Sequence, residues 1–155
     1  KFDVVTALFH VMSYQNSNES VEKVFKNVYN HLNDNGIFIF DCWYGPAVLS
    51  EQPEVRVKRL ENDKINITRI AEPVMRENEN IVEVHYDVFI QDKSTKKIRE
   101  LNETHIMRYF FIKEIEQLIH SYGFTLIDKF EFLTSYSLNK STWGSCFVVR
   151  KSNLY

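Results

Sequence analysis

The stretch FDVVTALF at residues 2–9 and the stretch IFIF at residues 37–40 decide the fold of this 155-residue chain. Both stretches are almost wholly apolar, and the first is β-branched at Val4, Val5 and Thr6. Unbroken apolar runs of this length predict strands that are covered on both faces, as in a parallel sheet. We therefore expect an open α/β sheet with two parallel strands near the start of the chain and helices on both of its faces.

The segment between these two strands is predicted to be a helix. Gln15 to Asn18 offer polar side chains that can cap its start, and residues 33–36 (NDNG) stop it, because Asn and Gly tolerate the left-handed conformation. Its apolar stripe has helical spacing and consists of Val21, Val24, Phe25, Val28 and Leu32. Strand, helix and strand form a βαβ unit over residues 1–50, which ends in a turn around Gly45 and Pro46.

The character of the sequence changes between residues 55 and 110, which are rich in Val, Ile, Thr and Tyr. Strands are predicted at residues 64–70, 81–90 and 98–110, with a turn at residues 92–95 (DKST). Because their alternation is partial, we expect a half-solvated antiparallel sheet inserted into the α/β sheet.

The last part of the chain, residues 111–155, returns to the α/β pattern. A helical stripe begins at Ile112 and ends at Tyr122, and Gly123 stands where a C-cap glycine is expected. Strands are predicted at residues 125–132 and 146–150. A chain of this length can bury one sizeable core, so we expect a single domain over residues 1–155.

Composition excludes several functions. The formal net charge is −2 without a Lys/Arg cluster, which argues against nucleic acid as a partner. Cys42 and Cys146 are too far apart for a CxxC metal motif, and no His/Asp/Glu set has ligand spacing, so no metal is expected. Both cysteines are predicted to be buried free thiols. Without a signal peptide or an apolar run long enough for a membrane span, they suggest a reducing cytoplasm.

Three stretches together resemble the class I S-adenosylmethionine-dependent methyltransferases. Residues 2–9 are similar to the fourth strand of that fold, residues 32–41 to its fifth strand, and residues 111–124 to the helix before its sixth strand. Residues 41–46 (DCWYGP), 82–86 and 103–105 resemble the aminosugar N,N-dimethyltransferases of macrolide biosynthesis more closely. The resemblance implies a partial Rossmann-like sheet with strands 4-5-7-6, S-adenosylmethionine as cofactor and a small-molecule substrate, such as an amine or aminosugar.

The first half of that fold has no counterpart in this sequence. The family's glycine-rich loop and its acidic ribose-binding residue match nothing here, and none of the 4 glycines forms a GxG. Lys1 leads directly into an apolar run. We therefore expect the carboxy-terminal half of a methyltransferase, cut from a longer protein, inactive alone and with little cofactor binding. Its exposed first strand predicts self-association to a homo-oligomer or strand exchange.

The resemblance and the fold together predict a cofactor and substrate site beyond the carboxyl ends of the strands. Ala7, Leu8, Phe9 and His10 end the first strand and are predicted to bind the cofactor, although Leu8 and Phe9 could equally be core residues. A base is useful when an amine acceptor arrives protonated. His10 and Tyr14 are the candidates, and since the aminosugar subgroup has a histidine where Tyr14 stands, the identity of the base stays open.

Four further residues are candidates for contact with the substrate. Trp43 and Tyr44 follow the second strand and could form an aromatic wall, or simply pack against the inserted sheet. His85 and His105 lie on predicted strands of that sheet, and alternation does not decide which face either occupies.

Two other interpretations remain open at this stage. The chain could be a non-enzymatic small-ligand-binding α+β module, which would lack the parallel strand pair. It could also be a natural partial subunit that another chain completes.

Overall fold

Parallel pairing between β1 (Phe2–Ala7) and β2 (Leu32–Tyr44) organises the fold in the computed structural model, which describes residues 1–152. The register runs from Val4 opposite Ile37 to Ala7 opposite Phe40, which confirms the predicted parallel pair. β2 is longer than the four predicted residues. It extends through Asp41 to Tyr44, because antiparallel pairing with β8 (Gly144–Lys151) continues along it as far as Trp43.

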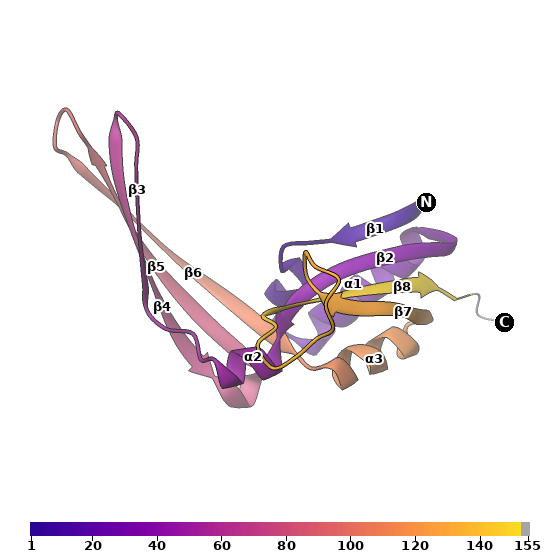
Figure 1. Cartoon of the computed structure of the whole chain (residues 1–155). Coiled ribbons are helices and arrows are strands. Elements are labelled where there is room, and N and C mark those ends of the chain that lie inside the picture. The colour runs from indigo at the N-terminus through magenta and orange to yellow at the C-terminus, as the bar shows by residue number, and fades with distance from the viewer. Residues whose placement is uncertain (153–155) are drawn as a thin grey trace. The chain divides into compact units, whose positions relative to one another are not determined.

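The described chain divides into two units. The first comprises residues 1–52 and the residues from 108 onward, and the second comprises residues 53–107. In the first unit the strands follow the order β1-β2-β8-β7, and β7 (Phe124–Glu131) runs antiparallel to β8 (Figure 1). The last residues of β6 (Ile98–Phe110) also pair with β2, in parallel, at Trp43 and Tyr44. The protein is thus a mixed α/β protein in which most strand pairs are antiparallel.

Two helices form the core of the first unit with one face of its sheet. α1 (Asn18–His31) is capped at its start by Ser17, whose hydroxyl accepts a hydrogen bond from the Ser20 backbone N–H at 3.1 Å. α1 buries Val21, Phe25 and Val28, as the helical stripe predicts, and α3 (Ile112–Ser121) buries Ile115 and Ile119. Strands contribute the rest of the core, chiefly Phe38, Phe40, Phe124, Phe147 and Val149.

The opposite face of this sheet differs from the prediction. Val4 and Thr6 are exposed, and Ile37, Ile39 and Val148 are only half-buried. The described residues therefore do not cover β1 on both faces, and α1 and α3 pack on the same face as the core side chains. An apolar run indicates that a strand can be buried, but it does not indicate which other elements cover the strand.

The second unit is a sheet with the order β3-β4-β5-β6. Its strands β4 (Ile65–Arg76) and β5 (Ile81–Asp92) pair antiparallel, as predicted. β3 (Arg56–Glu61), which is not among the predicted strands, pairs antiparallel with β4. The predicted turn after β5 is closed by Asp92, whose carboxylate accepts hydrogen bonds from the Ser94 hydroxyl and from the backbone N–H groups of Ser94 and Thr95. These bonds hold the pKa of Asp92 down to about 2.

Three short helices complete the described part of the chain: η1 (Val11–Tyr14), α2 (Gly45–Ser50) and η2 (Glu77–Glu79). The turn predicted around Gly45 and Pro46 is wrong, because these residues begin α2. Proline is tolerated in the first turn of a helix, where its missing N–H would have no partner within the helix. Gly123 ends α3 with a φ of 77°, in the left-handed region expected of a C-cap glycine.

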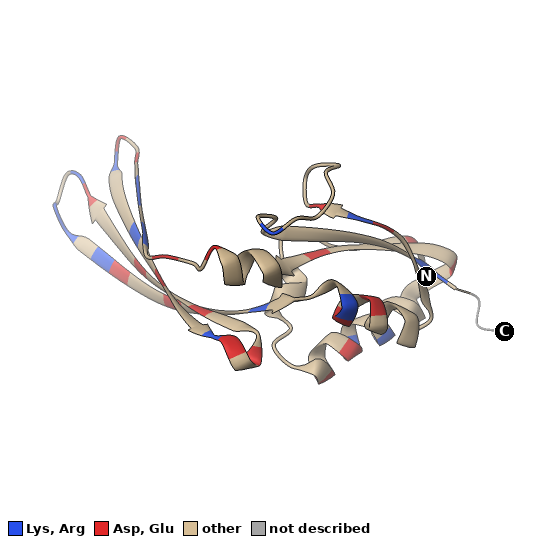
Figure 2. Cartoon of the chain, turned by 60° about the horizontal axis from the view of Figure 1, so that its bottom comes forward, with Lys and Arg blue, Asp and Glu red and all other residues tan. Residues whose placement is uncertain are grey.

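Charged residues of both signs are interspersed along the helices and strands (Figure 2). This agrees with the low net charge of −2. Within residues 1–152, no helix is both long and apolar enough to cross a membrane.

Candidate functional site

A histidine and a buried aspartate meet at the carboxyl ends of β1 and β2. His10 follows β1 by three residues, and its Nδ1 lies 2.6 Å from Oδ2 of Asp41 on β2. The same carboxylate oxygen accepts a hydrogen bond from the His10 backbone N–H at 2.9 Å. Asp41 is fully buried, whereas the His10 side chain is 34% exposed. Nδ1 itself is buried, so the exposed part of the His10 side chain consists of its other atoms.

The backbone that carries His10 is strained. Phe9 and His10 have φ values of 61° and 65°, in the left-handed region that costs a residue with a Cβ on the order of 1 kcal/mol. Two bonds hold this turn: the bond to Asp41, and one from the Ser13 backbone N–H to the His10 carbonyl at 2.9 Å. Strain of this kind persists only where surrounding contacts fix it, which is common at functional sites.

Aromatic rings surround the imidazole. The ring centroids of Trp43 and Phe132 lie 6.4 and 5.8 Å from that of His10, and both contacts are edge-to-face. Phe9 meets Phe132 edge-to-face at 5.5 Å. Gly144 makes the close approach of β8 possible, because a Cβ there would lie 3.2 Å from the imidazole Cε1. The faces of these rings are electron-rich and attract cations.

The arrangement can accept a proton and favour a positively charged ligand. An imidazole whose Nδ1 faces a buried carboxylate can take a proton at its other nitrogen, and the carboxylate then stabilises the positive charge. Aromatic faces next to that ring suit a bound cation. Within residues 1–152, no group of three or more His, Cys, Asp or Glu side chains is placed to hold a metal ion.

The structure brings some of the predicted residues together and leaves others apart. Phe9, His10 and Trp43 belong to the cluster just described. Phe9 is 70% exposed and does not serve as core, while Ala7 and Leu8 are half-buried. Tyr14 ends η1 with 46% of its surface exposed.

The backbone of Tyr44 takes part in strand pairing and in a hydrogen bond. It pairs with Phe110 of β6, and its N–H donates to the Trp143 carbonyl at 2.9 Å. Its side chain is half-buried.

His85 and His105 lie on opposite faces of the sheet in the second unit. His85 on β5 contacts the hydroxyl of Thr104 on β6 at 3.1 Å, and the ring of His105 lies 5.0 Å from that of Tyr86. Successive residues of a strand point to opposite faces, so Thr104 and His105 cannot share one. Hence at most one of the two histidines can contact a given substrate.

Sequence reasoning missed three members of the site. In the sequence, Asp41 is recognised only as part of a family motif and is not among the predicted site residues. An aspartate directly after an apolar strand is nevertheless a signal for a buried carboxylate. Phe132 and Trp143, whose ring lies 5.9 Å from that of Trp43, belong to the segment between β7 and β8. No pattern in the sequence connects that segment with His10.

Both cysteines are buried free thiols, as predicted. Burial raises the pKa of Cys42 to about 12 and that of Cys146 to about 11. At pH 8 the thiolate that reacts with disulfide reagents is therefore scarce. We expect the folded chain to react negligibly with Ellman's reagent at pH 8, and the chain unfolded in guanidinium to titrate both thiols. Rapid reaction of either cysteine in the folded chain would contradict this burial.

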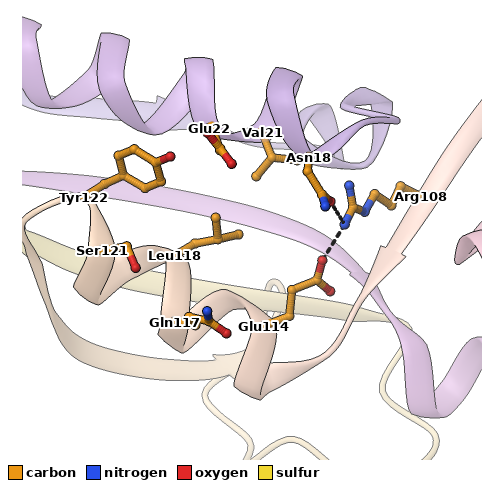
Figure 3. A pocket seen from close by; sticks show the side chains of 9 residues that line it. All are labelled: Asn18, Val21, Glu22, Arg108, Glu114, Gln117, Leu118, Ser121 and Tyr122. Atoms are coloured by element: carbon orange, nitrogen blue, oxygen red, sulfur yellow. Dashed lines mark hydrogen bonds and ion pairs between the residues drawn. The ribbon is translucent and has the colours of Figure 1, made fainter.

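A cavity of about 250 Å³ lies away from this cluster, between α1 and α3 (Figure 3). None of the residues that line it is a predicted site residue. At its end, the guanidinium of Arg108 donates from Nη2 to Oδ1 of Asn18 and to Oε1 of Glu114. The Arg108 side chain is only 9% exposed. Because Asn18 begins α1 and Glu114 lies in the first turn of α3, Arg108 ties the starts of the two helices together.

Replacing Arg108 with methionine should therefore destabilise the first unit. Methionine fills similar space but leaves the Glu114 carboxylate and the Asn18 amide without their donor, which costs about 1–3 kcal/mol. Urea unfolding followed by circular dichroism measures the change. Lys113→Met on the exposed side of the same helix is the matched control and should change stability by less than about 0.5 kcal/mol. An equal effect of the two substitutions would show that Arg108 is not a specific tie.

No protein-family model matches the chain, and no curated protein matches it. Solved structures do match. An S-adenosylmethionine-dependent methyltransferase from Clostridium acetobutylicum is 22% identical, with a TM-score of 0.83 over 99% of this chain and 59% of that one.

Two further matches are DesVI of Streptomyces venezuelae and CalS10 of Micromonospora echinaspora, an amino pentose methyltransferase solved with S-adenosylmethionine bound. DesVI is 19% identical, with a TM-score of 0.75 over 96% of this chain and 58% of its own. CalS10 is 16% identical, with a TM-score of 0.74 over 97% of this chain and 58% of its own. This chain thus spans about three fifths of each solved structure, and the likeness is one of fold.

Proposed function

Starting from a fold shared with S-adenosylmethionine-dependent methyltransferases, we propose that this chain forms the acceptor side of such an enzyme, acting on a small molecule in the cytoplasm. An amine or aminosugar is the first candidate for the acceptor. The observation that carries the proposal is the strand order β1-β2-β8-β7, which we assign to strands 4-5-7-6 of the methyltransferase fold. The parallel pair of β1 and β2 also disfavours a non-enzymatic binding module.

The residues after β1 fit one side of a cofactor site. Open α/β sheets bind ligands beyond the carboxyl ends of their parallel strands. There, Phe9 presents a ring that is 70% exposed, beside the half-buried apolar Leu8 and Ala7. Ala7, Leu8, Phe9 and His10 would hold S-adenosylmethionine, which supplies a methyl group on a positively charged sulfur. The chain's 4 glycines include no GxG, so the proposal gives these residues only one side of the cofactor.

The acceptor would lie against the exposed side of His10 and the aromatic rings next to it. An amine reacts only with a free lone pair, and at neutral pH most aliphatic amines carry a proton. His10 would take that proton, with Tyr14 as the other candidate base, and Trp43 and Phe132 would attract the cation through their ring faces. Positioning of the deprotonated amine then supplies much of the rate effect. Tyr44 and one of His85 or His105 remain proposed contacts to the rest of the acceptor.

The proposal is tested by methyl transfer from S-adenosylmethionine to a panel of amines, aminosugars and matching alcohols. The native polypeptide that carries this chain is the enzyme to assay, because the solved structures are longer than this chain. We expect release of S-adenosylhomocysteine, and an acceptor that gains one methyl group, with amines alone. Transfer only to alcohols would overturn the amine assignment. Absence of transfer together with absence of cofactor binding would overturn the function.

For this chain by itself we expect weak cofactor binding, since it offers residues for one side of the cofactor only. Calorimetric titration of the isolated chain with S-adenosylmethionine measures the affinity. A micromolar dissociation constant, about −8 kcal/mol of binding free energy, would contradict the expectation. S-adenosylhomocysteine serves as the control ligand, because it lacks the transferable methyl group and the positive charge on sulfur.

A further inference from the structure

Asp41 contacts His10 at two points, the ring and the backbone. Its Oδ2 lies 2.6 Å from Nδ1 of the ring and 2.9 Å from the backbone nitrogen of the same residue. Its Oδ1 has no hydrogen-bond partner among the described residues, and the whole side chain is buried. A carboxylate removed from water in this way requires a nearby proton donor or positive charge.

The distance decides where the proton of the imidazole sits. The ring N–H does not point straight at Oδ2, so the contact is an electrostatic one rather than a well-aligned hydrogen bond. At 2.6 Å, however, an unprotonated Nδ1 and a carboxylate oxygen would be two acceptors held closer than van der Waals contact. Two acceptors repel each other at that separation, so Nδ1 carries the proton of the neutral ring. The other nitrogen, Nε2, then has the free lone pair.

We propose that Asp41 is the positioning residue of the site: it keeps the proton on Nδ1 of His10 so that Nε2 accepts the proton of the substrate. This inference rests on the proposed function. An ammonium acceptor would give one proton to Nε2 and keep its nitrogen lone pair. The imidazolium formed would carry protons on both nitrogens beside the Asp41 carboxylate, and would return the extra proton to water after the transfer. Asp41 also holds the strained backbone of His10 through the bond to its N–H.

The tautomer of His10 tests the inference without any methyl transfer. Two-bond proton–nitrogen correlation spectra of chain labelled with ¹⁵N-histidine distinguish the Nδ1–H form, the Nε2–H form and the doubly protonated ring. At a pH where the ring is neutral, we expect the Nδ1–H form in the native protein. In Asp41→Leu we expect the share of the Nε2–H form to rise, because leucine has a similar size but offers no acceptor to the Nδ1 proton. Asp3→Asn on β1 removes an exposed carboxylate that binds Asn33, and should leave the His10 tautomer unchanged.

Each outcome decides the question. An Nε2–H tautomer in the native protein overturns the inference, and so does an Asp41→Leu protein that folds and keeps the Nδ1–H form unchanged. If Asp41→Leu does not fold, the native tautomer alone decides. In the active enzyme, Asp41→Leu should lower kcat about 100-fold with little change in KM, and should add little to the loss caused by His10→Gln. A protein with the expected tautomers and no methyl transfer would contradict the proposed function but not the role of Asp41.

Discussion

Replacing Phe40 with alanine should lower the free energy of unfolding by about 3–5 kcal/mol, the range for a large ring deleted from a packed core. Phe40 is fully buried on β2. Its ring stacks on Phe38 at 4.7 Å and on Phe147 at 5.3 Å, and meets Phe25 of α1 edge-to-face at 5.7 Å. The substitution therefore removes contacts to three elements at once and leaves a cavity that the stiff sheet cannot close.

Urea unfolding of the chain measures this loss through the shift of the midpoint at constant slope. Domains of this size are often stable by only about 5–15 kcal/mol, so Phe40→Leu provides a milder variant with an expected loss of about 1–2 kcal/mol. Phe2→Ala is the matched control, because Phe2 lies on β1 with 59% of its surface exposed. A loss for Phe40→Ala no larger than that for Phe2→Ala would mean that the aromatic cluster is not the core.

Replacing His10 with glutamine should lower kcat of methyl transfer to an amine by about 10²–10⁴-fold, the usual contribution of a general base. KM should change little, because the proposed role is proton transfer rather than binding. Glutamine keeps a polar side chain of similar reach that cannot take the proton. The defect should shrink as the pH rises toward the pKa of the acceptor amine, since an acceptor that arrives unprotonated needs no base.

Steady-state assays of S-adenosylhomocysteine release across pH measure both effects in the native polypeptide. His120→Gln, at the exposed end of α3, is the control and should keep full activity. Tyr14→Phe tests the other candidate base. A larger loss for Tyr14→Phe than for His10→Gln would move the role of base to Tyr14, and a His10→Gln defect that does not depend on pH would exclude proton transfer by His10.

The fold was largely predictable because it follows from local patterns. The apolar runs at residues 2–9 and 37–40, the stripe of α1 and the Gly123 stop report secondary structure directly, and the short connections leave few topologies. The boundaries of β2 were not predictable. Whether the strand continues past Phe40 depends on β8, which follows more than 100 residues later along the chain.

By itself, the sequence determined the parallel strand pair, the helix between them and the position of His10 after the first strand. Only the tertiary structure decided that Asp41 contacts His10, that Phe132 closes around it from the β7–β8 segment, and that His85 and His105 occupy opposite faces. The physical reason is the distance along the chain over which each kind of contact acts. Periodicity arises from neighbours within a few residues, whereas a site is formed by side chains that strand register brings together from distant parts of the chain.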